Sequence, residues 1–321
     1  LKYHLVTSTD PKVFFEEKSE SYVEIDNNLL ILSAGKTILR TRESDGYNHI
    51  YKLCFDGSTT QITKGEWNVR SVDFVDAEQG ILWLKVMGVN NDEDPYHMHL
   101  ARVNLDGSDF QLLTAGDGTH TWQWSPDRSY FIDTWSRVDM PPRSAVRDAR
   151  DGRVVCKLET ADISLLLKTD WPIPERFSAK GRDGETDIYG VIYRPSDFDP
   201  NKSYPIIEDI YAGPHDFFVP KSWGLNLKAQ NLAELGFIVV KIDGMGTNWR
   251  GKAFHDICWK NLNDAGFPDR IAWIQAAAKS RPWMDLKRVG IFGYSAGGQN
   301  AMGALLFHGD FYKAAVAVCG C

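Results

Sequence analysis

The chain has few cysteines, no long hydrophobic run and no concentration of positive charge. Its five cysteines are scattered over 321 residues and show neither zinc-motif spacing nor a disulfide framework. No apolar stretch approaches the roughly 20 residues that a membrane-spanning helix requires. The 36 basic residues are outnumbered by 43 acidic ones, for a net charge of -7, and no basic run occurs. We therefore expect no nucleic-acid partner, no membrane span, no metal and no cofactor.

The remaining composition is that of an ordinary globular protein, with 43% hydrophobic and 25% charged residues. This length favours two domains, each with its own core. The chain begins at Leu1 without methionine and ends at Cys321, directly after the apolar segment 314–318. We expect it to be a piece of a longer polypeptide, incomplete at both ends.

Short strand patterns with turn signals fill the first half of the chain. Residues 49–58 and 99–108 repeat one pattern, an alternating strand that runs into Asp-Gly, and residues 145–154 are a fainter copy. Asp-Gly between strands is a strong hairpin signal, because a type I′ turn needs positive φ at both central residues. A period of about 40–50 residues with several strands per unit predicts β-propeller blades. A β-sandwich with coincidental hairpins is the alternative.

The pattern changes between residues 160 and 185, where Trp-Pro-Ile-Pro at 171–174 forms an extended connector. Strand patterns and helical patterns then alternate, which predicts a mostly parallel sheet with helices on both faces. In the helical pattern at 267–280, Ile271, Ile274 and Ala278 fall on one face. We therefore divide the chain into propeller blades at 1–165 and an α/β domain at 166–321. The strands are expected at 188–194, 204–211, 237–242, 288–292 and 314–318, and the helices at 228–235, 267–280 and 296–307.

A pentapeptide, Gly-Tyr-Ser-Ala-Gly at 293–297, lies between an apolar strand pattern and a small-residue helix. In that setting it predicts a nucleophile elbow, a sharp turn that exposes the hydroxyl of Ser295 above the sheet. The helix that starts at Ala296 directs its first backbone N–H groups at an oxyanion formed there. Tyr211 follows another strand, where a phenol is placed to donate a second hydrogen bond, although packing alone explains it equally well.

A serine nucleophile requires a base, and in α/β-hydrolases the acid and the histidine follow the serine in the chain. Here only His308 and Asp310 follow Ser295 as a histidine and an acid. His308 lies thirteen helical positions away, about 20 Å from the hydroxyl, and is expected to sit at the helix C-terminus. We therefore expect the triad acid and histidine to lie outside this chain.

Five segments in order resemble the prolyl oligopeptidase family of serine peptidases, in its dipeptidyl peptidase IV-like branch. They are residues 44–51, 62–67, 209–214, 243–247 and 293–298. The resemblance implies a β-propeller followed by an α/β-hydrolase domain, both partial here. It implies Ser295 as nucleophile, with the Tyr211 hydroxyl and the Ala296 N–H at the oxyanion, in an enzyme that hydrolyses short peptides through an acyl-enzyme. It also implies peptide substrates and a periplasmic or secreted location, and a homodimer is a further expectation.

Other interpretations of the same residues stay open. The same fold serves acylaminoacyl peptidases and esterases, and the propeller is alternatively a binding module beside an inert hydrolase half. Met245 stands where the family has arginine, and Ala296 where this branch has tyrosine. Glu16 and Glu17 are interpreted as a solvated charge pair. His97 and His99 share one strand face, as two metal ligands would, but without a third ligand nearby a structural histidine pair is favoured.

Overall fold

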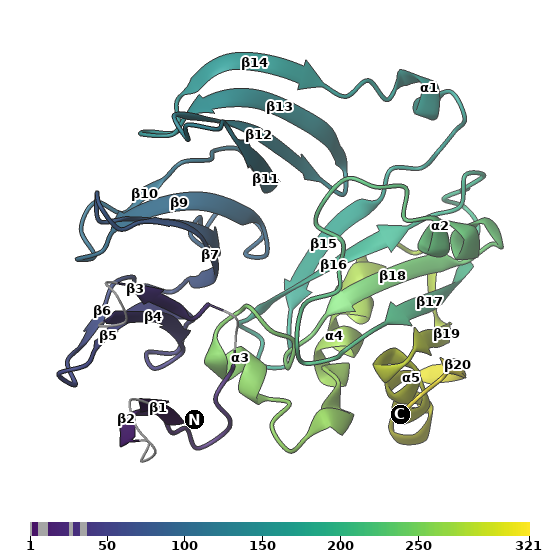
Figure 1. The fold of residues 1–321 in the computed structure, drawn as a ribbon. Helices are drawn as coiled ribbons and strands as arrows, with labels where there is room; N and C mark the ends of the chain where they lie inside the picture. Colours follow the sequence, from purple (N-terminus) through teal and green to yellow (C-terminus); the bar gives the residue numbers. More distant parts are fainter. Residues whose placement is uncertain (1, 6–11, 26–27, 33–36) are drawn as a thin grey trace. The chain divides into compact units, whose positions relative to one another are not determined.

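The computed structural model describes residues 2–5, 12–25, 28–32 and 37–321 (Figure 1). The chain forms two compact units that interleave in sequence. One comprises residues 1–133, 145–157 and 249–259, and the other comprises residues 134–144, 158–248 and 260–321.

Antiparallel sheets of four strands build the first half of the chain, as expected for propeller blades and not for a sandwich. The sheet orders are β3-β4-β5-β6, β10-β9-β8-β7 and β11-β12-β13-β14, and β1 pairs with β2. The strands are β1 Lys2–Leu5, β2 Lys12–Glu16, β3 Leu30–Leu32, β4 Thr37–Arg42, β5 His49–Cys54, β6 Thr59–Gln61, β7 Asn68–Asp76, β8 Ile81–Met87, β9 Met98–Asn104, β10 Gln111–Leu112, β11 Thr119–Trp124, β12 Tyr130–Arg137, β13 Met140–Asp148 and β14 Val154–Thr160.

The sequence repeat corresponds to a repeated histidine–threonine contact. His49 Nδ1 lies 3.0 Å from Thr63 Oγ1, and His99 Nδ1 lies 3.0 Å from Thr114 Oγ1. Each threonine oxygen also accepts the N–H of the residue after the histidine. Each imidazole is 2% exposed or less, so the pair joins the first strand of the repeat to the turn after its hairpin.

The interpretation of Glu16 and Glu17 as a solvated pair is wrong for Glu17. Its side chain is buried, and its carboxylate forms ion pairs with Arg40 at 2.9 Å and Arg42 at 3.0 Å. Two guanidinium groups therefore compensate the carboxylate that burial would otherwise destabilise.

A six-stranded sheet of order β15-β16-β18-β17-β19-β20 forms the core of the second half. The pairs β17–β18, β17–β19 and β19–β20 are parallel, whereas β15–β16 and β16–β18 are antiparallel. The predicted parallel sheet thus carries an antiparallel edge, a common arrangement in large α/β sheets. Its strands are β15 Glu175–Lys180, β16 Asp187–Tyr193, β17 Tyr204–Ile210, β18 Ile238–Asp243, β19 Met284–Tyr294 and β20 Tyr312–Val318.

Helices cover both faces of this sheet. Ala229 and Ala233 of α2 pack against Val191 and Tyr193, whereas Trp273 of α4 lies under Gly190. Since successive strand residues point to opposite faces, α2 and α4 lie on opposite sides of β16. The helices are α1 Ser164–Leu167, α2 Leu227–Glu234, α3 Lys252–Asp256, α4 Phe267–Lys279 and α5 Ala296–Phe307, with a 3₁₀ turn at Leu262–Asp264.

The buried face of α4 differs from the one predicted. Phe267, Arg270, Trp273, Ile274 and Ala277 are buried, whereas Ile271 and Ala278 are only partly covered. The hydrophobic periodicity predicted the wrong face because Arg270, a charged residue, is fully buried at the centre of the true one.

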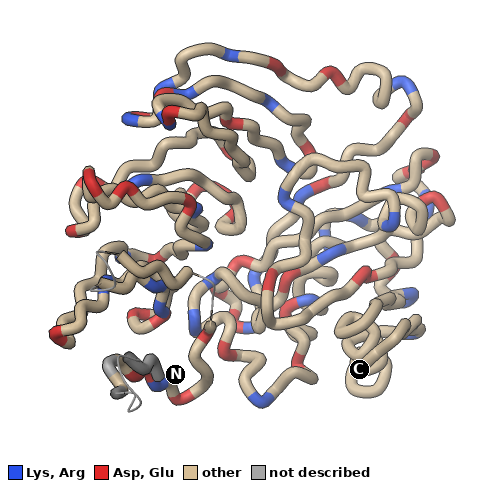
Figure 2. Tube along the Cα trace, in the orientation of Figure 1, with Lys and Arg blue, Asp and Glu red and all other residues tan. Residues whose placement is uncertain are grey.

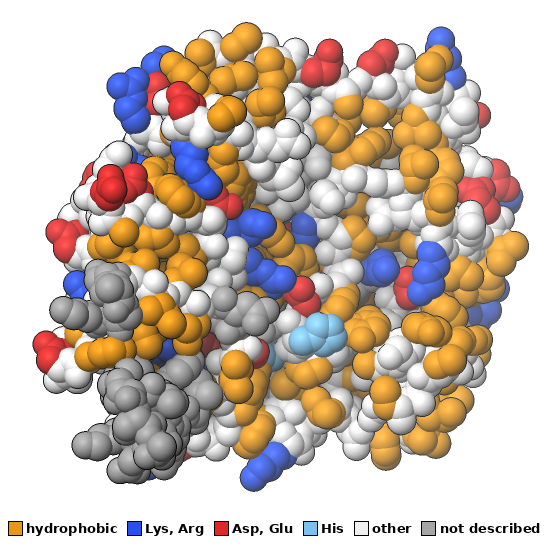
Figure 3. Space-filling view, viewed as in Figure 1, with side chains coloured by type: hydrophobic (Ala, Val, Ile, Leu, Met, Phe, Trp, Pro, Cys, Tyr) orange, Lys and Arg blue, Asp and Glu red, His pale blue; other side chains and the backbone are white. Residues whose placement is uncertain are grey.

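Charged residues of both signs are interspersed along the chain (Figure 2). Helix α5 and strand β20 together carry one charged side chain, Lys313. Around this part of the chain Figure 3 shows many hydrophobic side chains at the surface, and Leu306 and Phe307 of α5 are 67% and 66% exposed. Among the described helices, none is both long and apolar enough to cross a membrane.

Candidate active site

Ser295 occupies a sharp turn between β19 and α5, as predicted. Its backbone has φ 57° and ψ -125°, a conformation that a residue with a side chain adopts only at a cost. Its N–H donates to Val318 O at 2.9 Å, and its carbonyl oxygen accepts from Gly298 N at 2.7 Å. Backbone hydrogen bonds on both sides therefore hold the turn, while the side chain remains partly exposed.

The glycines around Ser295 are required by close backbone contacts. A Cβ at Gly293 would lie 1.9 Å from Gly297 O, and a Cβ at Gly297 would lie 2.3 Å from Ile210 O. A Cβ at Gly298 would lie 2.5 Å from Val318 O. Each distance is shorter than any real contact, so a side chain at these positions would force the elbow apart.

Helix α5 begins at the residue after Ser295. The first N–H groups of a helix have no acceptor within the helix, and the aligned peptide dipoles place partial positive charge at that end. The N–H groups of Ala296 and Gly297 are therefore available to an anionic oxygen beside the Ser295 hydroxyl.

Tyr211 leaves the sheet at the same edge as Ser295. Ile210, the last residue of β17, pairs with Gly293 of β19, so Tyr211 and Ser295 follow neighbouring parallel strands. The Ala212 N–H donates to Asn300 Oδ1 on α5 at 3.0 Å, which ties the loop after β17 to the elbow helix.

The Tyr211 ring packs on Phe218 with ring centroids 4.4 Å apart. Phe218 is fixed in turn by Asp243, whose carboxylate accepts the N–H groups of Phe218 and Val219 at 2.9 and 2.8 Å. Asp243 is fully buried, and this burial raises the pKa of its carboxyl. These contacts explain why an aspartate stands at the end of β18.

The turn after Asp243 is held by a second carboxylate. Asp269 of α4 accepts the Met245 N–H at 2.9 Å and also binds the Arg182 guanidinium. A Cβ at Gly244 would lie 2.9 Å from Gly266 Cα, which explains both glycines. Helix α4 has no side-chain cap, and Asp269 in its first turn instead fixes the turn after Asp243.

The predicted site residues Tyr211, Ser295 and Ala296 thus share one edge of the sheet. His308 lies at the C-terminal end of α5, as predicted, and its ring packs against Phe267. Across the described residues, no imidazole is hydrogen-bonded to the Ser295 hydroxyl. Asn300 and Phe218 were missed by sequence reasoning, because neither belongs to the motifs that carried the prediction.

Comparisons with known proteins agree with this geometry. Residues 223–321 match the model of the prolyl oligopeptidase family, and residues 2–142 match that of the dipeptidyl peptidase IV N-terminal region. The chain is 29% identical over 268 residues to a protein described as probable dipeptidyl-aminopeptidase B of Emericella nidulans, covering 81% of this chain and 29% of the relative. It is 24% identical to human dipeptidyl peptidase 8, covering 97% of this chain and 38% of the relative.

The crystal structure of Porphyromonas gingivalis dipeptidyl peptidase 4 superimposes with a TM-score of 0.80 and 25% identity, covering 97% of this chain and 44% of that one. This chain therefore spans less than half the length of these relatives. Both halves, the propeller blades and the hydrolase sheet with its elbow, have counterparts in one type of protein. The two halves of this chain thus match the two regions of the dipeptidyl peptidase IV-like branch of the prolyl oligopeptidase family of serine peptidases.

Proposed function

We propose that this chain supplies the nucleophile and the oxyanion site of a serine peptidase that hydrolyses short peptides by acyl transfer, with release of dipeptides. The relatives reported above are dipeptidyl peptidases, which favours this function over the acylaminoacyl peptidase, esterase and non-catalytic alternatives. The proposal extends to a homodimer and to a boundary near residue 165 between the propeller blades (1–165) and the hydrolase domain (166–321).

In this mechanism the Ser295 Oγ attacks the scissile carbonyl carbon, and the carbonyl oxygen becomes an oxyanion. The Ala296 N–H and the Tyr211 hydroxyl donate hydrogen bonds to that oxygen, where they stabilise the transition state more than the substrate. The C–N bond then breaks, the amine leaves with a proton, and water hydrolyses the acyl-serine ester. The general base that takes the serine proton is assigned to no residue of this chain.

The backbone of Ser295 is the observation that carries the proposal. A serine with φ 57° costs about 1–3 kcal/mol, and such strain persists where the surrounding structure enforces it. The glycine contacts and the hydrogen bond from Ser295 N to Val318 O enforce it here. A structural turn would relax this strain with glycine at position 295, whereas a nucleophile cannot.

Covalent labelling with a fluorophosphonate tests the assignment. We expect the full-length enzyme to gain one adduct, which peptide mass spectrometry places on Ser295, and Ser295→Ala to gain none. A Ser178→Ala variant, with its serine in edge strand β15, serves as the matched control and should label like the parent. An adduct on another serine, or no adduct on folded enzyme, rejects Ser295 as the nucleophile.

A further inference from the structure

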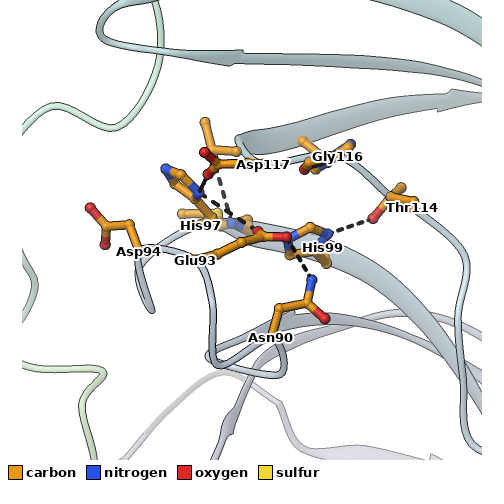
Figure 4. A network of polar contacts seen from close by, with 12 residues as sticks. Asn90, Glu93, Asp94, His97, His99, Thr114, Gly116 and Asp117 are labelled. Atoms are coloured by element: carbon orange, nitrogen blue, oxygen red, sulfur yellow. Dashed lines mark hydrogen bonds and ion pairs between the residues drawn. The ribbon is translucent and has the colours of Figure 1, made fainter.

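Three potential metal ligands from two loops converge in the part of the propeller built on β7–β10. Glu93 lies in the connection between β8 and β9, His97 directly precedes β9, and Asp117 lies between β10 and β11. Their ligand atoms all lie within 4.8 Å of one another. His97 Nδ1 is 3.2 Å from Asp117 Oδ1 and 3.8 Å from Glu93 Oε2, and Figure 4 shows the three side chains pointing toward one another.

His97 is the informative member of this group. Its side chain is 2% exposed, and its Nδ1 is buried without a hydrogen bond to any residue that the structure describes. Asp117 Oδ1 lies 3.2 Å from this nitrogen, but the contact does not meet the geometry of a hydrogen bond. This buried imidazole nitrogen therefore faces two carboxylates without a hydrogen bond that satisfies it.

Two side chains, His99 and Asn90, orient the carboxylate of Glu93. His99 Nε2 lies 2.9 Å from Glu93 Oε2, and Asn90 donates to Oε1 at 2.8 Å. Because Thr114 occupies the other nitrogen of His99, the Nε2–H faces Glu93. A carboxylate oriented in this way by neighbouring side chains is the arrangement found for metal-ligating carboxylates.

We propose that Glu93, His97 and Asp117 bind a divalent transition metal, with Zn²⁺ as the best match. One imidazole nitrogen and two carboxylate oxygens suit this ion, whose bonds to such ligands are about 2.0–2.2 Å. Tetrahedral bonds of that length separate ligand atoms by about 3.3 Å, close to the 3.2 and 3.8 Å found. Asp117 is 41% exposed, so the ion has a path from solvent and water can complete its coordination.

The sequence favoured a structural pair of His97 and His99 because no third ligand was in view, whereas the structure places Glu93 and Asp117 beside His97. His99 supports Glu93, and the other ligands come from loops on either side of the histidine strand. A bound ion would tie the connection before β9 to the residues that lead into β11 of the next blade sheet, and so stabilise the contact between consecutive blades.

The preceding repeat provides an internal control. Counted from the paired histidine and threonine, Glu43, Tyr47 and Glu66 stand where Glu93, His97 and Asp117 stand. Both carboxylates are retained there, but tyrosine replaces the ligating histidine. Within the described residues, only the group with His97 has the geometry of a metal site.

Titration of the 321-residue chain with Zn²⁺ against a chromophoric chelator tests the proposal. We expect one equivalent to bind to the wild type, and Asp117→Asn, an exposed and nearly isosteric change, to weaken this affinity at least tenfold. The matched control, Glu66→Gln in the preceding repeat, should bind like the wild type. Excess Zn²⁺ should raise the Tm of the wild type and of Glu66→Gln by several degrees, but not that of Asp117→Asn.

Cobalt distinguishes this site from the thiols of the five cysteines. Co²⁺ bound by Glu93, His97 and Asp117 shows ligand-field bands without a thiolate charge-transfer band. Unchanged affinity in both Asp117→Asn and His97→Tyr, a thiolate band, or no stoichiometric binding to the folded wild type would each overturn the proposal. Because Asp117 is exposed, the test does not depend on whether His97→Tyr folds.

Discussion

Gly293 and Gly297 face each other across the turn at Ser295, with Gly297 O 1.9 Å from the position that a Cβ of Gly293 would occupy. Because the end of the strand and the first turn of the helix approach so closely, the backbone of the elbow cannot adopt another conformation. The strain at Ser295 is thus fixed by its neighbours and not by its own side chain, so the elbow is expected to fail when either glycine gains a methyl group.

Gly297→Ala is predicted to destabilise the protein by about 1–3 kcal/mol and to abolish labelling of Ser295, because its methyl group would press against Ile210 O. Gly303→Ala in the same helix is the matched control, since its Cβ meets only the Phe267 ring at 3.9 Å. Helix propensity favours alanine there by about 1 kcal/mol. Urea unfolding and fluorophosphonate labelling measure both effects, and equal behaviour of the two variants would contradict the steric account.

Tyr211→Phe is predicted to slow acylation of Ser295 by about 10²–10³-fold, the usual cost of one oxyanion donor. The ring contact with Phe218 survives this change, so the free energy of unfolding should stay within about 0.5 kcal/mol of the parent. The measurement is the labelling rate constant in the full-length enzyme, with Tyr130→Phe on an exposed strand residue as control. A parental rate in Tyr211→Phe would reduce Tyr211 to a packing residue.

The elbow could be predicted from sequence because its residues are contiguous. The motif Gly-x-Ser-x-Gly between an apolar strand and a helix reflects the backbone conformation of the turn itself. Strand β19 and helix α5 form where expected, although β19 extends beyond the predicted residues 288–292. The Asp-Gly hairpins of the repeat were predictable for the same reason.

Features that join distant segments could not be predicted in this way. Asn300 holds the Tyr211 loop from 88 positions away, and Arg270 reaches Glu208 across 62. Glu93 and Asp117 approach His97 from separate loops, so their spacing in the sequence does not predict that the three side chains meet. In each case the partner is set by the packing of strands and helices.

Lowering the pH is predicted to destabilise the chain through His49. Burial lowers the pKa of its imidazole below the usual 6.5, so the unfolded state binds the proton more readily. The contribution of the neutral imidazole is complete above pH 6.5 and is lost as the pH falls toward the folded-state pKa, by at most about 1.4 kcal/mol per pH unit. Urea unfolding at several pH values should show a shallower dependence in His49→Gln than in the wild type, and identical slopes would refute the assignment.

Glu208 and Arg270 form an ion pair of 2.8 Å in which both side chains are fully buried. The Tyr312 hydroxyl donates to the second carboxylate oxygen at 2.7 Å, and the guanidinium also donates to the carbonyls of Ala265 and Ile242. Removing one partner leaves a desolvated charge, so Arg270→Met is predicted to cost about 3–5 kcal/mol of unfolding free energy.

The double variant Glu208→Gln with Arg270→Met removes both charges, and is predicted to be more stable than Arg270→Met alone because no uncompensated charge remains. The exposed pair Lys180–Asp187, at 2.8 Å, provides the contrast: Lys180→Met should change the unfolding free energy by less than about 1 kcal/mol. Urea unfolding of the four proteins measures these differences. If the double variant is less stable than Arg270→Met, Tyr312 and the other neighbours stabilise the carboxylate without the guanidinium. The prediction that an uncompensated Glu208 charge destabilises Arg270→Met would then be wrong.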